Sequence, residues 1–376
     1  MDDDGVARDK PEAADAALSL EGNEPMSQWM PVRGVLVRVV VVVVVLGLSG
    51  WALFRIFDDL DWIGIRNALG ELSDAEWLAL IFGWLVWVAS QGAMTASLVD
   101  GLPVRRGVLA SLGPTAVASV IPGPSDLPVR FSMYRSWGVA SATAATAIGA
   151  NGIFSIGSQL ILPSIAGILI ITADVPLSGF LSVIVTASIT LAVIVASAAF
   201  VLGSTRRTEA AGRRFDGAVR VIMRRLKKPE LDENLGTFLA DKRSVTLEYL
   251  ADKWLPTTGA TILANATRFA LLVMVLRFVG IPEDALSWVA VFAVYGLVAG
   301  LTAIPITPGS AGVAEIGLVG MLTAATGDGW VNQIAAGVLL YRLMTWLLVI
   351  PVGLASLGVW RYRNRASKQV SSVKTT

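Results

Sequence analysis

Residues 286–326 read LSWVAVFAVYGLVAGLTAIPITPGSAGVAEIGLVGMLTAAT, and no other stretch constrains the architecture so tightly. It holds a single charged residue, Glu315, as expected of a segment in a lipid bilayer. Prolines 305 and 308 with glycines 309 and 312 interrupt it, and a helix does not run through such a cluster. At membrane depth a break of this kind is tolerated only inside protein or beside water. We therefore predict a broken helical hairpin over residues 286–329, with its break beside a cavity.

The whole chain has the composition of a membrane protein. Of its 376 residues, 54% are hydrophobic and 16% are charged, with a mean hydropathy of +0.66. Soluble domains carry about 25% charged residues. The apolar blocks are continuous rather than alternating, which favours helices over a β-barrel. We predict an all-α integral membrane protein.

Six apolar blocks reach the ~20 residues that a transmembrane helix requires. The first contains seven consecutive valines, 39–45, which lipid keeps helical in spite of their low helix propensity. A break is expected at Pro163 in the third block. The predicted full spans cover residues 35–57, 77–98, 139–172, 179–203, 255–279 and 331–360.

A second interrupted hairpin is predicted over residues 108–137. Its apolar run, residues 108–121, is too short to cross a bilayer comfortably. The run ends in PGPSDLP, residues 122–128, where three prolines within seven residues stop a helix. As in the other hairpin, a Pro-Gly pair is followed by a lone acid, here Asp126.

The distribution of Lys and Arg gives the two hairpins opposite orientations. Basic flanks such as Arg105 and Arg106 stay in the cytoplasm, and acidic flanks such as residues 58–76 then lie outside. Hairpin 108–137 leaves and returns on the cytoplasmic side, and hairpin 286–329 does so on the outer side. Interrupted segments at matching places in two halves are typical of an inverted-repeat transporter and its binding site. The alternative is that Pro and Gly are simply more frequent in membrane helices.

This pattern divides the chain into five parts. Residues 204–228 hold nine Lys and Arg against two acids, with apolar residues at helical spacing. They indicate a basic amphipathic helix on an anionic lipid surface rather than a nucleic-acid site. The predicted parts are a disordered cytoplasmic tail (1–34), a first transmembrane half (35–203), a basic cytoplasmic segment (204–253), a second transmembrane half (254–360) and a cytoplasmic tail (361–376).

Three charged residues fall in the middle of apolar segments: Arg268, Glu315 and Arg342. A charge at a helix centre costs about 2.5–3.5 kcal/mol on insertion scales, so such residues usually face the protein interior and pair. Glu315 is expected to pair with Arg342 or Arg268. The pair either belongs to a substrate route or only fixes helix packing. Arg130 is expected at headgroup depth, where it holds a lipid phosphate or sets the topology.

The chain has no cysteine and no histidine. This excludes disulfides, thiolate nucleophiles, imidazole bases and the usual ligands of zinc, haem and iron–sulfur clusters. No Walker motif occurs, so ATP is not used directly. We expect no cofactor and no metal. A membrane enzyme would depend on Asp126 or Glu315 alone, which is a poor active site.

Three motifs resemble the transmembrane family of lysylphosphatidylglycerol synthases, also called flippase-like. PGSAGVAE at residues 308–315 resembles the family signature Pro-Gly-Gly-x-Gly-x-Arg-Glu. PGPSD at residues 122–126, with Arg130, resembles the first motif of the family. YRLMTW at residues 341–346 resembles its last helix, and the likeness covers roughly residues 35–360.

The resemblance implies a bacterial inner-membrane protein in which two re-entrant hairpins move a lipid or lipid-linked precursor between leaflets. The chain has Ser310 and Ala314 where the signature has Gly and Arg, and Ser125 and Asp126 where the first motif has Gly and Glu. The missing arginine implies a different headgroup or none. Because the chain ends about 16 residues after its last predicted span, we expect neither an aminoacyl-transferase domain nor enzymatic activity.

Two functions remain open: translocation of a lipid, and a non-transporting scaffold for a membrane lipid or a cell-envelope glycosyltransferase. The expected partners are a membrane lipid and an anionic lipid surface, with no nucleic acid, and a homo-oligomer is compatible with the sequence. We expect a multi-pass plasma-membrane protein with both termini in the cytoplasm. The residues expected to bind substrate are Pro122, Gly123, Asp126, Arg130, Arg268, Pro308, Gly309, Gly312, Glu315, Tyr341 and Arg342.

Overall fold

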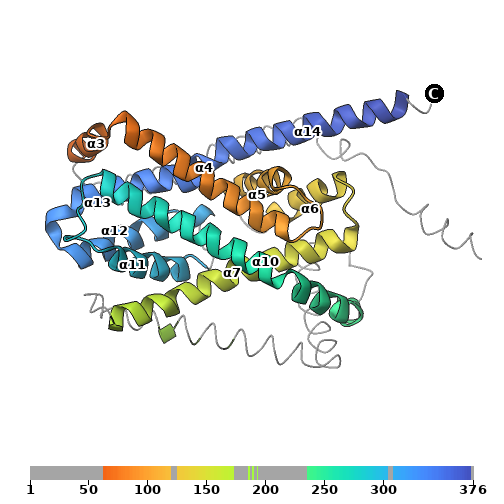
Figure 1. Cartoon of the computed structure of the whole chain (residues 1–376), viewed down its shortest axis with the longest axis horizontal. Coiled ribbons are helices and arrows are strands. Elements are labelled where there is room, and N and C mark those ends of the chain that lie inside the picture. The colour runs from red at the N-terminus through yellow and green to blue at the C-terminus, as the bar shows by residue number, and fades with distance from the viewer. Residues whose placement is uncertain are drawn as a thin grey trace, which may run out of the picture. The chain divides into compact units, whose positions relative to one another are not determined.

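The computed structural model describes a set of helices (Figure 1). The described residues are 62–119, 125–172, 185–186, 189, 193, 235–303 and 308–373, all within the compact unit Ser49–Thr376. No strand occurs among them. The predicted span 35–57, almost all of the span 179–203 and the basic helix 204–228 lie outside this part of the chain.

Four helices are long and apolar enough to cross a membrane, and they confirm four of the six predicted spans. The first is α4 (Asp74–Ser97), which Ser73 and Glu76 start with a reciprocal capping box. The second is α7 (Ser141–Thr172). The third is Ala251–Phe278, the later part of α10 (Leu235–Phe278). The fourth, Val331–Asn364, combines α13 (Val331–Arg342), the π-helical turn η5 (Leu343–Leu347) and part of α14 (Val349–Val373).

The break predicted at Pro163 is wrong, because α7 continues through it. A proline removes one backbone hydrogen bond, but neighbouring helices can accommodate it in a membrane bundle. Here a Cβ added to Gly300 would meet the Pro163 ring, so the two helices are packed directly at this point. Two other boundaries extend beyond the predicted spans: α10 already begins at Leu235, and α14 continues to Val373.

Each predicted hairpin consists of two shorter helices with a break between them. In the first half these are α5 (Val104–Ala118) and α6 (Asp126–Ser136). In the second half they are α11 (Trp288–Leu301) and α12 (Val313–Thr326), with the short turn η3 (Pro308–Ser310) just before α12. The remaining short elements are α3 (Trp62–Gly70) and η4 (Asp328–Trp330).

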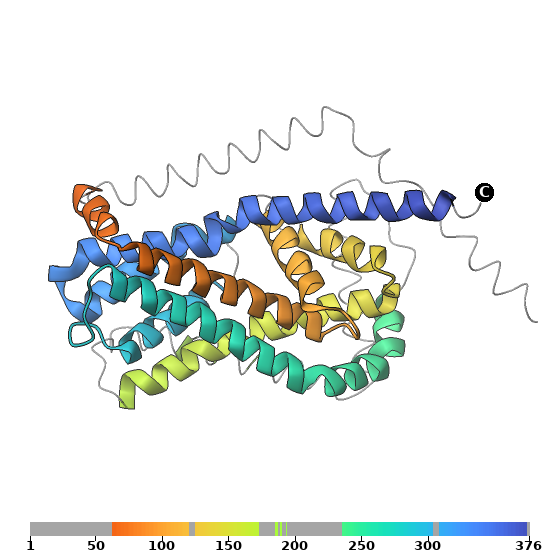
Figure 2. The same cartoon turned by 45° about the horizontal axis from the view of Figure 1, so that its top comes forward.

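Small residues let the helices of the two halves pack closely. α4 packs along α10, α5 along α14 and α7 along α11 (Figure 2). On α14, a Cβ at Gly353 would collide with the Leu112 carbonyl oxygen and Ala116 of α5. On α11, a Cβ at Gly296 would meet the carbonyl oxygen of Leu162, 2.7 Å away, in α7. Glycine at these contacts permits the close backbone approach that is common between membrane helices.

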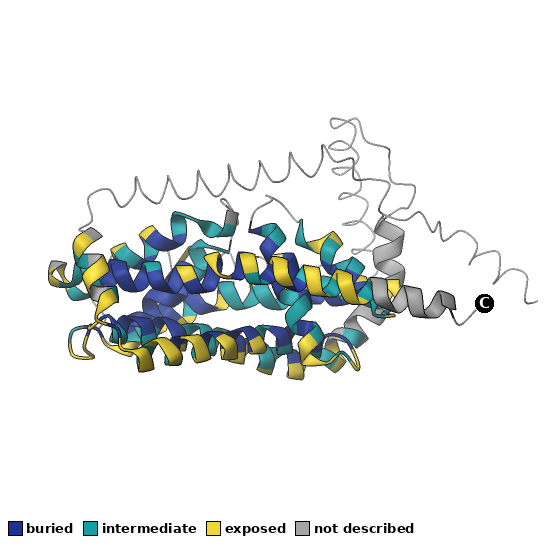
Figure 3. Ribbon diagram, turned by 90° about the horizontal axis from the view of Figure 1, so that it is seen from above, coloured by how far each residue is buried: buried dark blue, intermediate teal, exposed yellow. Residues whose placement is uncertain are grey.

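Burial is consistent with a bundle in lipid. The main core lies between α4, α10, α11, α12 and α13, whereas the outer faces carry exposed apolar side chains (Figure 3). Phe82 on α4 is 69% exposed and Ile171 on α7 is 72% exposed. Large apolar side chains exposed along a long apolar helix face lipid rather than water.

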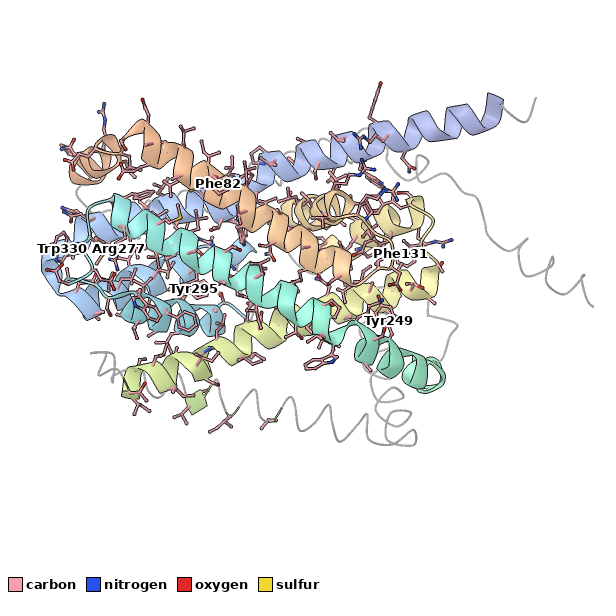
Figure 4. All side chains as sticks on the ribbon, viewed as in Figure 1. Phe82, Phe131, Tyr249, Arg277, Tyr295 and Trp330 are labelled. Atoms are coloured by element: carbon pink, nitrogen blue, oxygen red, sulfur yellow. The ribbon has the colours of Figure 1, made fainter. Side chains whose placement is uncertain are left out.

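The two ends of the bundle are formed by different hairpins. Figure 4 shows Arg277 and Trp330 at one end and Phe131 and Tyr249 at the other. Trp330 follows α12 of the second hairpin, and Phe131 belongs to α6 of the first.

Candidate functional site

The second break is built from backbone that few side chains tolerate. Gly309 has φ 60° and Gly312 has φ 86°, conformations in the left-handed region that glycine adopts without a steric penalty. Ser310, between them, has φ 56° and is the only non-glycine residue with positive φ in the described chain. The family signature has glycine at the position of Ser310, which agrees with the positive φ of this residue. A Cβ on Gly309 would also collide with the indole of Trp346.

Glu315 and Arg342 form a buried ion pair, one of the two pairings that the sequence left open. Glu315 is fully buried and Arg342 is 6% exposed. The second carboxylate oxygen of Glu315 accepts a hydrogen bond from the Gly312 amide at 2.7 Å, which caps α12. Arg342 Nη2 donates to the Gly309 carbonyl oxygen at 2.7 Å. The pair therefore ties the broken segment to α13.

A π-helical turn follows Arg342 directly and shapes the site. In this turn, η5, the Met344 carbonyl oxygen accepts a hydrogen bond of 2.7 Å from Trp84 Nε1 of α4. The Trp346 ring lies 5.3 Å from the Arg342 guanidinium carbon, a distance at which the cation is attracted to the ring face. Isolated π turns inside α-helices are frequent at functional sites. No feature of LMTWL, residues 343–347, distinguishes it from ordinary helix in the sequence.

Arg268 is held separately from Glu315. Its Nε donates to the Tyr341 hydroxyl at 3.0 Å, so Arg268 bonds the residue that precedes Arg342 on α13. Tyr295 of α11 donates to the Asn265 side-chain oxygen at 3.3 Å, one turn before Arg268 on α10. Tyr341 of α13 and Asn265 of α10 therefore each bond a side chain of another helix.

A cavity of about 270 Å³ lies where the two broken hairpins and the long helices meet. α5 of the first hairpin contributes Ser111, Thr115 and Ser119 to its wall, and the second hairpin contributes Gly309 and Ser310. Arg268, Tyr341 and Arg342 also line it, together with Trp87, Gln91, Gln159, Thr345 and Trp346. No carboxylate is among the described residues of its wall.

The cavity wall is rich in hydrogen-bond donors. Two of the five N–H groups of Arg342 are used by Glu315 and Gly309. The indole nitrogens of Trp87 and Trp346 are buried and have no hydrogen-bond partner in the described part of the chain. Buried polar groups are almost always satisfied, so such donors indicate an unseen acceptor such as a ligand or water. Two guanidinium groups and only one nearby carboxylate favour an anion.

The first-motif residues lie apart from this cavity. Arg130 is buried and 3.7 Å from Asp126 one turn earlier on α6, and neither residue lines the cavity. Arg130 Nε has no partner among the described residues. Pro122 and Gly123 lie outside the described part, although Ser119 brings the cavity wall to within a few residues of them.

Of the other predicted residues, Gly309, Arg268, Tyr341 and Arg342 line the cavity, and Glu315 and Gly312 contact it only through their bonds to this group. Pro308 begins η3. The sequence interpretation missed the hydroxyl row of α5. Its signal was present, because residues 111, 115 and 119 recur every four positions and so share one helix face.

No group of three or more His, Cys, Asp and Glu side chains that could hold a metal is found in residues 62–119, 125–172, 235–303 and 308–373. The described wall of the cavity instead offers guanidinium, hydroxyl and indole groups, which are hydrogen-bond donors.

Comparison with known proteins agrees with the motifs. A search of curated proteins found no match. A family model described as the lysylphosphatidylglycerol synthase TM region matches residues 35–353, which include every residue that lines the cavity. The match covers most of the chain. The chain is therefore an integral membrane protein of the lysylphosphatidylglycerol synthase transmembrane family.

Proposed function

We propose that this protein translocates an anionic lipid, a phospholipid or a lipid-linked precursor, between the leaflets of the plasma membrane. The observation that carries this function is the cavity between the two broken hairpins, whose wall contains Arg268 and Arg342 but no described carboxylate. Guanidinium groups are suited to phosphate because their planar N–H donors match its oxygens.

An inverted repeat supports this proposal. α5 and α6 correspond to α11 and α12, and α4 corresponds to α10. If the halves are exchanged, α5 takes the place of α11 and α14 takes the place of α7. The α5–α14 contact then becomes the α11–α7 contact, and both contacts are present. A glycine permits close approach in each contact, although Gly353 belongs to α14 and Gly296 to the hairpin helix α11, which are not equivalent helices. We infer that the hairpins are re-entrant from opposite faces, as alternating access around a fixed site requires.

The size of the cavity determines which part of a lipid it can hold. At about 270 Å³ it lies near the lower end of the roughly 300–1,000 Å³ of ligand pockets, so it accommodates a headgroup and not two acyl chains. An apolar groove of about 480 Å³ runs between α7, α10 and α11, and it shares Asn265 and Tyr295 with the cavity. Tyr295 is labelled in Figure 4. The headgroup would cross through the cavity while its tails remain in this groove and the bilayer.

In this proposal, the charged and hydroxyl-bearing residues around the cavity have distinct roles. Arg268 and Arg342 attract the phosphate, and Glu315 holds Arg342 in place without contacting the substrate. The hydroxyl row of α5 offers hydrogen bonds from the other hairpin. Since the chain has no Walker motif, the energy source is an ion gradient, the membrane potential or mass action.

The test is lipid movement in liposomes that contain the purified protein and fluorescent phosphatidylglycerol, with a quencher added outside. Arg268→Gln removes a cavity charge that has only one described hydrogen bond. We expect its transport rate to fall about tenfold or more, since hydrogen bonds to charged groups contribute about 1.5–3 kcal/mol. Arg66→Gln, at an exposed arginine of α3, is the matched control and should transport normally.

Two results would contradict this function. If Arg268→Gln transported lipid at the wild-type rate, the cavity would not lie on the transport route. Absence of transport by the wild-type protein, together with co-purification of a glycosyltransferase, would favour the scaffold function.

A further inference from the structure

A second polar cavity lies at a different place in the bundle, between the start of α5, the end of α6 and α14. Its volume is about 550 Å³, and none of its lining residues belongs to the central cavity. Three arginines, two tryptophans, one serine and one asparagine form its polar wall: Arg105, Arg106, Arg363, Trp137, Trp360, Ser136 and Asn364.

The wall of this cavity is organised by contacts between helices. Trp360 Nε1 of α14 donates to the Ser136 hydroxyl of α6 at 2.8 Å. The Arg106 guanidinium carbon lies 5.6 Å from the Trp137 ring centre, within the range of cation–π attraction. The Trp360 bond therefore links α14 to α6, and the Trp137 ring lies beside Arg106 of α5. Arg106 is only partly exposed.

The described residues supply no negative charge that would balance the arginines of this cavity. No carboxylate lines it, and no ion pair involves Arg105, Arg106 or Arg363 in the described chain. Three cations held around one cavity repel each other, and a shared anion removes this cost. A phosphodiester fits, because each guanidinium can donate two N–H bonds to phosphate oxygens.

The depth of the cavity identifies the source of the phosphate. The candidate membrane span Val331–Asn364 ends at the arginine and asparagine of this wall, so the cavity lies near a membrane–water boundary. Tyr362 and Val359 are 78% and 45% exposed beside it. Tryptophan, tyrosine and arginine side chains gather at headgroup level in membrane proteins. Lipid tails would contact the apolar flank while the phosphate reaches the arginines.

We propose that this cavity, which we call the α5–α14 pocket, binds the phosphodiester of an anionic phospholipid. The lipid is a bound structural ligand rather than the transported substrate, and it bridges the first hairpin to the last helix. Arginines that only set the membrane topology need no cavity, and their exact positions on the helix do not matter. Arginines that bind a phosphate in the pocket must line it. Arg361, also exposed on α14 but outside the pocket, separates them.

The experiment uses the full chain in nanodiscs of phosphatidylcholine, with phosphatidylglycerol that carries a photoreactive group near its headgroup. Cross-linked peptides are identified by mass spectrometry. We expect cross-links at residues 134–137 and 359–364 that excess phosphatidylglycerol displaces but equal phosphatidylcholine or inorganic phosphate does not. Arg363→Gln, and Arg105→Gln with Arg106→Gln and Arg363→Gln together, should weaken binding, the triple variant by about tenfold. Arg361→Gln should bind as wild type does.

Three outcomes overturn the proposal: absence of cross-links at these peptides, equal loss in Arg361→Gln and Arg363→Gln, and displacement by inorganic phosphate as effective as by lipid. The first and third outcomes are measured on the wild-type protein, so a folding defect of the triple variant cannot hide them. The readout is independent of transport, because cross-links at the central cavity map to other peptides.

Discussion

At the residue scale, the ion pair of Glu315 and Arg342 combines a structural part with a chemical one. Glu315 caps α12 through the Gly312 amide and holds Arg342 through its other oxygen. Arg342 in turn bonds the Gly309 carbonyl and lines the cavity. Removing one partner leaves the other as an unpaired buried charge, whereas removing both charges avoids that penalty.

This difference gives a prediction for double substitution. Glu315→Gln and Arg342→Gln should each lower the free energy of unfolding by about 3–5 kcal/mol. The double variant should lose less than the sum of the two, because the charges are coupled. Its lipid transport should nevertheless stay low, since the cavity has lost the Arg342 charge. Thermal unfolding in detergent and the liposome assay measure the two properties. Recovery of both stability and transport would show that the pair only fixes packing.

The sequence predicted these residues better than it predicted their partners. Lone charges in apolar segments marked Arg268, Glu315 and Arg342, because lipid penalises an unpaired charge at a helix centre. The choice between the two arginines needed the fold, which places Arg342 of α13 against Glu315 and Gly309.

At the element scale, composition was enough to predict the four long apolar helices of the described chain and the places where each hairpin divides into two helices. Length and hydropathy set the spans, and Pro-Gly clusters set the breaks. Pro163 shows the limit of this reasoning, since the same residue type sits inside the unbroken α7. A lone proline is accommodated by the α11 surface around Gly300, whereas clusters at 122–128 and 305–309 remove several backbone bonds at once.

Helix packing across the two halves depends on glycine at specific positions. Gly353→Ala should lower the free energy of unfolding by about 1–3 kcal/mol, because its new methyl group meets the Leu112 carbonyl oxygen of α5. Gly358→Ala, on the same helix with open space around it, should be neutral or stabilising. Thermal unfolding of the purified variants checks both expectations. Equal effects of the two substitutions would contradict the close packing of α5 on α14.

At the scale of the whole molecule, helices from both parts of the family domain line the central cationic cavity. In the proposed inverted repeat, the pairing of α5 with α14 corresponds to the pairing of α11 with α7. The described bundle ends also differ in charge: Glu283 and Asp284 follow α10 at one end, and Arg105 and Arg106 begin α5 at the other. A lipid that crosses from leaflet to leaflet would meet both hairpins on the way, one from each membrane face.

The most direct test of this account is thiol accessibility in sealed vesicles of both orientations, since the chain contains no cysteine. Val104→Cys marks the start of the first hairpin, Asp284→Cys precedes the second, and Ser119→Cys and Ser310→Cys lie in the cavity wall. We predict that a membrane-impermeant reagent labels position 104 only from the cytoplasmic side and position 284 only from the outside, and that a small hydrophilic reagent reaches both cavity positions. Labelling of 104 and 284 from the same side, or cavity thiols that react only after denaturation, would contradict two opposed hairpins around a polar cavity.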